Sequence, residues 1–169
     1  MDRQHCCCFT GHRPGRLPWG WKEDAPAAQA LKARLAREVT QAYHRGYRHF
    51  ICGMAQGADL YFCQAVIDLK HNVSDVSLEA AIPFPGQAEH WPPADQERRR
   101  TLLLGCDFET VVQHHYSPSC MARRNRYMVD HAALLLAVYD GNPRGGTAGT
   151  LAYALTQGLE TVVLDPTDV

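Results

Sequence analysis

A glycine-rich turn between a predicted strand and a predicted helix is the strongest chemical signal in this sequence. The turn contains Gly145, Gly146 and Thr147, with Asp140 before it and Thr150 after it. Glycines let a ligand approach the backbone closely, and the first turn of a helix presents unpaired N–H groups and the positive end of the helix dipole. No lysine follows the glycines, so the turn is not a Walker A loop. It predicts a phosphate site; a tight strand-to-helix turn without a ligand is the alternative.

Two further loops place polar residues directly after predicted strands. They read Thr10-Gly11-His12-Arg13 after residues 5–10, and Gly53-Met54-Ala55-Gln56-Gly57-Ala58-Asp59 after residues 48–52. Arg13 suits a phosphate because its guanidinium can bind two oxygens at once, and a solvated arginine is the alternative. His12 is either an acid–base group or a structural hydrogen-bond partner. Asp59 either accepts hydrogen bonds from ribose hydroxyls or favours the helix dipole.

An arginine-rich segment falls on the helix that we predict over residues 119–132. At helical spacing Arg124 and Arg126 lie on different sides of this helix, so at most some of its arginines can face a ligand. We take Arg124 and Asn125 as ligand-binding candidates; a solvated face is the alternative. The histidine pairs in the sequence have no third partner at metal-ligand spacing, and we predict no metal site.

Length and composition predict one globular domain over residues 1–169. The formal net charge of −1 is not that of a non-specific nucleic-acid binder, so we do not expect nucleic acid as a partner. The odd count of seven cysteines, three of them consecutive, argues against a disulfide framework. We find no signal-peptide pattern and no apolar run of about 18 residues, so we expect no membrane span and a cytoplasmic location.

Strands and helices alternate along the whole chain. We predict strands over residues 5–10, 48–52, 77–82, 109–113, 134–138 and 161–164. We predict helices over residues 58–69, 94–104, 119–132 and 147–157, after a first helix that Asp24 caps and Gly46 ends. This order indicates an α/β, Rossmann-like three-layer fold with a mostly parallel sheet and helices on both faces. The three polar loops all follow strands, so they should converge at the carboxyl edge of the sheet.

Four motifs occur in a fixed order: Phe9-Thr10-Gly11-His12-Arg13, Gly53-Met54-Ala55-Gln56-Gly57-Ala58-Asp59-Leu60, Arg124-Asn125-Arg126-Tyr127-Met128-Val129-Asp130 and Gly145-Gly146-Thr147. Together they resemble the SLOG superfamily, in particular its small single-domain YpsA-like branch, over about residues 5–164. The resemblance implies a Rossmann-like fold that binds a nucleotide or nucleotide-derived ligand, with phosphate at the turn of residues 145–147. It implies no further cofactor.

Two relatives within this superfamily suggest different activities. The Lonely Guy phosphoribohydrolases carry the motif Pro-Gly-Gly-x-Gly-Thr-x-x-Glu, in which the Glu is catalytic; they also imply a homodimer. Here Ala152 or Tyr153 stands where that Glu would be. We therefore expect a binding or sensing protein rather than an enzyme. The alternatives are an N-glycoside hydrolase that uses Asp59 or Asp140 in place of the Glu, and single-stranded DNA binding like that of the DprA or Smf family.

Overall fold

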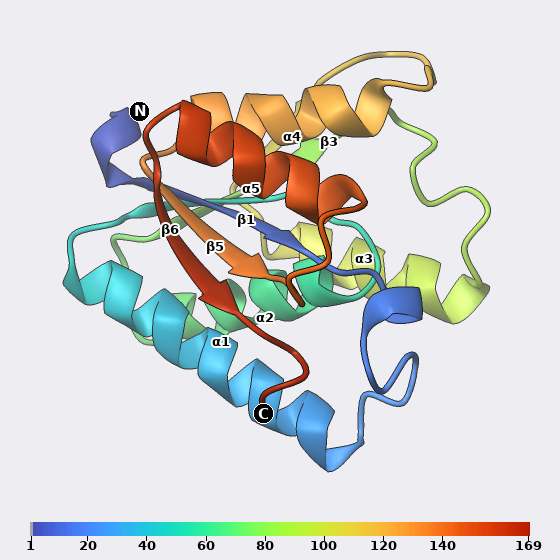
Figure 1. The fold of residues 1–169 in the computed structure, drawn as a ribbon. Helices are drawn as coiled ribbons and strands as arrows, with labels where there is room; N and C mark the ends of the chain where they lie inside the picture. Colours follow the sequence, from blue (N-terminus) through green and yellow to red (C-terminus); the bar gives the residue numbers. More distant parts are fainter. Residues whose placement is uncertain (1) are drawn as a thin grey trace.

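Six parallel strands form one sheet in the computed structural model, which describes residues 2–169 (Figure 1). The strands are β1 (Cys6–Gly11), β2 (His49–Cys52), β3 (Ser77–Ile82), β4 (Phe108–Val111), β5 (Leu134–Val138) and β6 (Glu160–Leu164). Their spatial order is β4-β3-β2-β1-β5-β6, and all five pairings are parallel. The chain first builds outward from β1 to β4 and then returns to place β5 on the other side of β1. The direction of winding thus reverses between β1 and β5, the place where such sheets bind ligands.

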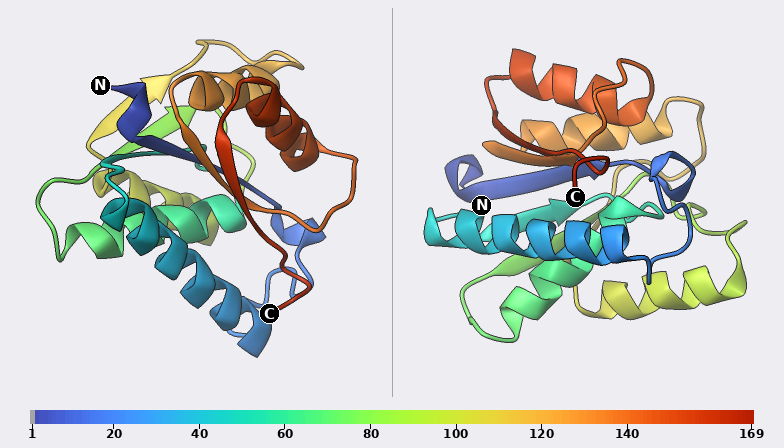
Figure 2. Two further views of the ribbon diagram at one scale, coloured as in Figure 1. Left: turned by 60° about the vertical axis from the view of Figure 1, so that its left-hand side comes forward. Right: turned by 60° about the horizontal axis from the view of Figure 1, so that its bottom comes forward.

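Helices cover both faces of the sheet, which confirms the predicted three-layer α/β fold. They are α1 (Pro26–His44), α2 (Ala58–Lys70), α3 (Pro93–Leu104), α4 (Cys120–Asp130) and α5 (Gly146–Thr156), with short 3-10 turns η1 (Arg3–His5) and η2 (Pro14–Arg16). In the right-hand view of Figure 2, α4 and α5 lie above the sheet and α1, α2 and α3 lie below it. The polar loops at the carboxyl ends of β1 and β5 are therefore flanked by helices from both layers.

Each face of the sheet has its own apolar core, and the cysteine run of β1 contributes to both. Cys7 packs in the larger core with α1 and α2, whereas Cys6 and Cys8 pack in the smaller core under α4 and α5. This alternation is the one expected of successive residues on a strand. On α1, Leu31 and Leu35 are fully buried at helical spacing. All seven cysteines are free thiols.

One local prediction, the cap of α1, is wrong, and one strand has other bounds than predicted. Asp24 does not cap α1: the N-cap residue is Ala25, and no side chain caps the helix. Pro26 occupies the first helical position, because its fixed φ suits that position and its missing N–H costs nothing there; Asp24 then lies one residue too early to cap. The predicted strand over residues 109–113 is instead β4, which begins at Phe108 and ends at Val111 because the chain leaves this edge of the sheet.

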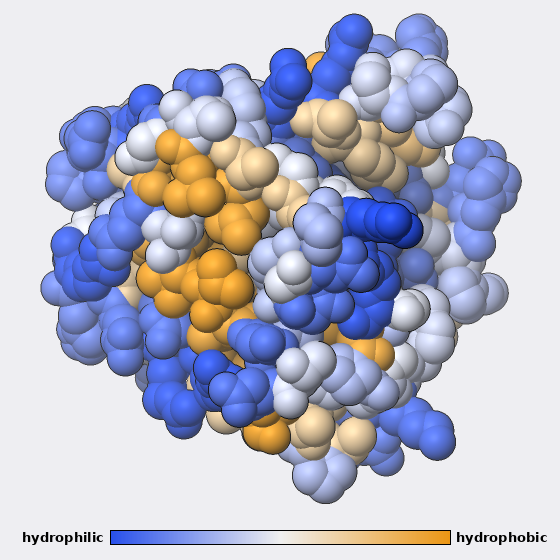
Figure 3. Space-filling model, in the orientation of Figure 1, coloured by the Kyte–Doolittle hydropathy of each residue, from blue (hydrophilic) through white to orange (hydrophobic). Residues whose placement is uncertain are grey.

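The surface seen in Figure 3 is mostly polar, with an apolar patch over β6 and the C-terminal end of α5. Leu155 and Val163 are exposed there. Among residues 2–169, no helix combines the length and the apolar character that a membrane span requires.

Candidate functional site

A cavity of about 280 Å³ lies at the carboxyl ends of β1 and β5, between the N-termini of α2 and α5 and the side of α4. Ten of the sixteen predicted ligand-binding residues line it: Thr10, Gly11, His12, Arg13, Asp59, Arg124, Asn125, Gly145, Gly146 and Thr147. Phe9, Arg16, Ala55, Met121 and Met128 complete the lining. The three loops therefore converge on one cavity, as their positions after parallel strands predict.

The N-terminus of α5 opens onto this cavity without a side-chain cap. Gly145, with φ of 102°, is the N-cap residue, and Gly146 begins the helix. Within the described chain, the N–H groups of Gly146, Thr147 and Ala148 have no acceptor, as expected for the first turn of a helix. Thr147, a buried residue, lines the cavity, and no hydrogen bond of its hydroxyl is found among residues 2–169. These unpaired donors form a group suited to an anion.

A buried arginine and a buried aspartate lie opposite this helix end. The Arg124 guanidinium donates to the Gly53 carbonyl and, through Nε, to Asn125 Oδ1 at 2.8 Å. Asp59 Oδ2 accepts a hydrogen bond from the Ala55 N–H at 3.1 Å. Burial raises the pKa of the Asp59 carboxyl, and the positive charge of Arg124 opposes this rise. Burial likewise lowers the pKa of Arg124, which Asp59 opposes. The opposite charges of Arg124 and Asp59 thus offset part of the cost of burying each charged group in the cavity wall.

Gly53, also a predicted ligand-binding residue, lies against this pair and does not line the cavity. A Cβ at residue 53 would collide with the Arg124 guanidinium and lie 2.8 Å from Asp59 Oδ2. Gly57 has a comparable role, with φ of 88° and with 2.7 Å between a hypothetical Cβ and the His12 carbonyl oxygen. The missing side chain allows the Ala58 N–H to donate to that oxygen at 3.1 Å, which joins the first two loops.

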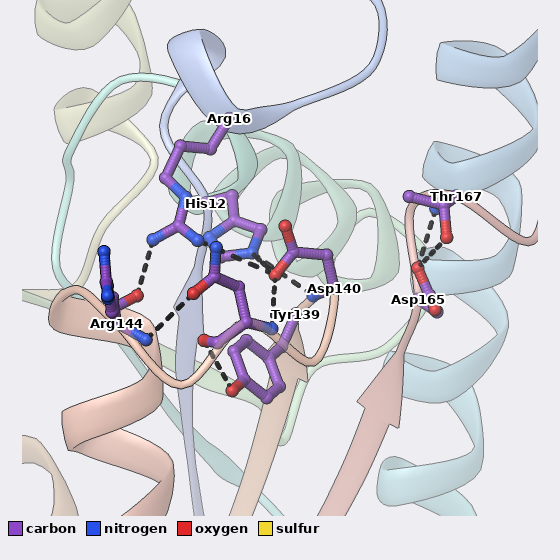
Figure 4. A network of polar contacts seen from close by, with 8 residues as sticks. His12, Arg16, Tyr139, Asp140, Arg144, Asp165 and Thr167 are labelled. Atoms are coloured by element: carbon purple, nitrogen blue, oxygen red, sulfur yellow. Dashed lines mark hydrogen bonds and ion pairs between the residues drawn. The ribbon is translucent and has the colours of Figure 1, made fainter.

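His12 and Asp140 belong to a polar network at the edge of the cavity (Figure 4). His12 Nε2 lies 2.9 Å from Asp140 Oδ1, and Arg16 Nη1 donates to the Arg144 carbonyl at 2.6 Å. A hydrogen bond from the Asn142 N–H lowers the pKa of the Asp140 carboxyl, and burial opposes this slightly. The neighbouring His12 and Arg16 lower the pKa further. Asp140 itself does not line the cavity. Its contacts fix the loop between β5 and α5 next to β1.

Three other predicted residues point away from the cavity. Met54 is fully buried behind it, with φ of 57°. Gln56 Nε2 donates to Asp95 Oδ2 at 3.0 Å, on α3. The Thr150 hydroxyl donates to the Gly146 carbonyl at 2.8 Å, and Thr150 faces a groove between α4 and α5. These three residues belong to segments of the chain that reach the cavity, but their own side chains do not line it.

Sequence reasoning missed Arg16 and Met121, which both line the cavity. Arg16 follows Arg13 by three residues, and the 3-10 turn η2 brings it back over the loop between β5 and α5. The spacing of these two arginines was a usable signal, whereas Met121 had none. A larger groove of about 700 Å³ lies elsewhere, between residues 85–89 and α3. Among the described residues, no group of three His, Cys, Asp or Glu side chains could hold a metal ion.

Comparison with known proteins places this fold and these motifs in a family. The sequence profile of the YpsA family, described as the YspA SLOG family, matches residues 7–165. The chain belongs to this family. A UPF0398 protein of Bacillus pumilus (strain SAFR-032) is 29% identical over 141 residues, which cover 80% of this chain and 75% of that protein. A UPF0398 protein of Bacillus thuringiensis (strain Al Hakam) is 27% identical over 151 residues, 88% of this chain and 82% of that protein.

Two solved structures of DNA processing protein A (DprA) share the fold. The protein from Streptococcus pneumoniae aligns with a TM-score of 0.61 and 14% identity, over 95% of this YpsA-family chain and 50% of that chain. The protein from Helicobacter pylori aligns with a TM-score of 0.59 and 13% identity, over 99% of this chain and 71% of that one. The present chain thus spans half the length of the S. pneumoniae protein. At these identities the similarity shows the fold, and the ligand must be argued from the cavity.

Proposed function

We propose that the cavity holds the phosphate of a nucleotide or nucleotide-derived ligand and that the protein binds or senses this ligand. One observation carries the proposal: five polar side chains line the cavity although each residue is only 2% to 7% exposed. They are Thr10, His12, Asp59, Arg124 and Thr147. Buried polar groups are costly unless they are paired. A cavity that collects them, with unpaired hydroxyl and N–H donors, is suited to a polar ligand.

The charges of the cavity favour an anion. Arg13, Arg16 and Arg124 line it against one carboxylate, that of Asp59. The positive end of the α5 dipole points at the same space. A phosphate there would accept hydrogen bonds from the N–H groups of α5, and the arginines would neutralise its charge.

A hydrolase is the second candidate, and one observation favours it. Asp59 is the one carboxylate among the cavity-lining residues, and burial raises the pKa of its carboxyl. A carboxyl group with a raised pKa is suited to general acid catalysis. Tyr153, near the position of the phosphoribohydrolase Glu, instead donates its hydroxyl to Asp130 at 2.8 Å. Asp59 would have to take over the whole acid–base role, so we favour binding over hydrolysis.

The DprA protein of H. pylori has a single-stranded DNA binding mode. In the present chain, exposed Arg13 and Arg144 near the cavity could contact the backbone of such a strand. The expectation that nucleic acid is not a partner therefore needs a direct test, and a labelled oligonucleotide belongs in the binding experiment.

The test is calorimetric titration and native mass spectrometry with AMP, ADP-ribose, NAD, cyclic nucleotides and a single-stranded oligonucleotide. Gly146→Asp places a carboxylate at the N-terminus of α5, where a Cβ meets no atom within 4 Å. We expect this variant to weaken binding at least tenfold, about 1.4 kcal/mol. Leu155→Asp is the matched control, because it adds the same charge to an exposed position of α5 that lines neither cavity nor groove.

The outcomes separate the candidates. An intact nucleotide adduct that Gly146→Asp abolishes and Leu155→Asp retains supports the binding protein. Free base released from the nucleotide supports the hydrolase, and retention of the oligonucleotide alone supports a DNA-binding role. Equal affinity of Gly146→Asp and the wild type for every ligand would show that the N-terminus of α5 is not the phosphate site.

A further inference from the structure

A second hollow of about 420 Å³ runs between α4 and α5. Its walls come from one side of each helix, at the spacing that places residues on a common face. They are Pro118, Met121, Ala122, Asn125 and Arg126 from the α4 side, and Gly146, Gly149, Thr150 and Tyr153 from α5. A Cβ on Gly146 or Gly149 would meet no atom within 4 Å. The two helices thus leave a slot that side chains do not fill.

This α4–α5 groove is continuous with the phosphate cavity. Met121, Asn125 and Gly146 line both hollows. The N-terminus of α5, at Gly146, is therefore the point at which a ligand in the cavity would pass into the groove. With volumes of about 280 and 420 Å³, the two hollows together are in the size range of small-molecule sites, ~300–1,000 Å³.

We propose that the α4–α5 groove holds the base of a nucleotide whose phosphate lies at the N-terminus of α5. This inference rests on the proposed function and deepens it, because it assigns a separate place in the fold to the base of the ligand. The Gln56 amide, which could have contacted a base within the phosphate cavity, turns away from it to Asp95.

The chemistry of the groove fits a heteroaromatic base. Met121 and Ala122 supply apolar walls, and Asn125 lies where the groove meets the cavity. Asn125 Oδ1 accepts a hydrogen bond from Arg124 Nε, which leaves the amide NH₂ group to donate to an acceptor atom of the base. Bases are recognised in this way, by stacking on flat side chains and by hydrogen bonds to their edges.

A flat cationic surface forms the far end of the groove. The Arg126 guanidinium lies over the Tyr153 ring, 5.2 Å from its centroid, and the Tyr153 hydroxyl donates to Asp130 at 2.8 Å. These contacts hold both planar groups in place. Aromatic rings and guanidinium planes are the surfaces on which bases stack. An aliphatic ligand would gain nothing from this arrangement.

The experiment compares two probes, AMP and ribose 5-phosphate, by calorimetric titration. Stacking on protein side chains contributes ~1–3 kcal/mol per base, so AMP should bind roughly tenfold to a hundredfold more tightly. Gly149→Trp fills the groove from α5 and Ala122→Phe fills it from α4. Each variant should bind AMP only as tightly as ribose 5-phosphate. Its affinity for ribose 5-phosphate should equal that of the wild type. Thermal melting of each variant shows whether it is folded.

Each outcome decides the inference. AMP affinity lost in both filled variants, with ribose 5-phosphate affinity retained, supports the groove as the base site. Equal affinities for AMP and ribose 5-phosphate in the wild type, or full AMP affinity in a folded filled variant, would overturn it while the proposed phosphate site stands. If neither probe binds, the inference is overturned, while the proposed function is decided by the other nucleotides of its panel. If Gly146→Asp binds both probes as the wild type does, the proposed function fails and the inference fails with it.

Discussion

A buried carboxylate on β3 should make the stability of this protein strongly dependent on acid. Glu79 accepts hydrogen bonds from the Tyr127 hydroxyl at 2.6 Å and from the Thr110 hydroxyl at 2.8 Å, and His49 Nε2 lies 2.6 Å from its other oxygen. Burial alone would raise the pKa of Glu79, but these hydrogen bonds outweigh it and hold the pKa at about 2. Tyr127 lies on α4, the helix that carries Arg124, so the same contacts hold the candidate site in place.

The size of the effect follows from this pKa. The ordinary value is 4.5 and the value in the folded protein is about 2. The difference of about 2.5, at 1.36 kcal/mol for each pH unit, corresponds to ~3 kcal/mol of folding free energy. Because the folded pKa is lowered, this contribution is fully present above pH 4.5. It is lost as the pH falls through 4.5 toward 2, and only ~1 kcal/mol should remain near pH 3.

Urea denaturation of the wild type and Glu79→Gln at pH 7, 5, 4 and 3 measures this contribution. Glutamine mimics the protonated carboxyl, so the variant should be less stable by ~3 kcal/mol at pH 7, and the gap should shrink to ~1 kcal/mol at pH 3. Other carboxylates are common to both proteins and cancel in the difference. Glu109→Gln, an exposed substitution on the neighbouring strand, is the control and should show no such trend. A gap for Glu79→Gln that stays constant with pH would refute the reasoning.

Two further predictions concern the loops of the site. Gly57→Ala should destabilise the fold by ~3 kcal/mol, because it adds a collision with the His12 carbonyl to the cost of positive φ. Gly46 also has positive φ but lies in open space, so Gly46→Ala should cost only ~1 kcal/mol. Equal losses of the two variants in urea denaturation would contradict this. Burial raises the pKa of Asp59, so the wild type loses stability as the pH rises above 3.8 and the buried carboxyl becomes charged. Asp59→Asn has no such charge, so its stability relative to the wild type should increase over the same pH range. Stability curves of both proteins from pH 4 to 8 check the sign.

The sequence predicted which helices and strands exist better than it predicted the residues at which they begin and end. The bounds of β3 and β5 match the prediction, because each is a short apolar run with buried residues throughout most of its length. The predicted bounds of β4 were shifted by one residue at its start and two at its end, since its residues are exposed or half-buried and give no comparable apolar pattern. The order of the strands in the sheet could not be predicted from the residue pattern of each strand. It depends on the side of β1 on which each later strand is added. The reversal between β1 and β5 became visible only in the sheet.

The location of the site was predictable, whereas the directions of its side chains were not. Parallel strands bring their carboxyl ends together, so the convergence of the three loops followed from the element order alone. Gln56 and Thr150 fit their motifs, yet Gln56 bonds to α3 and Thr150 bonds back to its own helix. The direction of Gln56 depends on the turn that precedes α2, and that of Thr150 on its phase within α5. Arg16 was missed for the same reason, because η2 rather than an open loop returns it to the cavity.

The glycines of the motifs in this chain therefore have two different structural roles. Gly146 lies in the cavity wall and leaves the N–H groups of α5 accessible to a ligand. Gly53 lies behind the wall, where its missing side chain makes room for Arg124 and Asp59 and its carbonyl accepts a hydrogen bond from Arg124. A side chain at residue 53 would displace the arginine, and the cavity would lose a cation without any change in the residues that line it. A substitution at residue 53 would thus change the cavity through the position of Arg124, although residue 53 itself does not line the cavity.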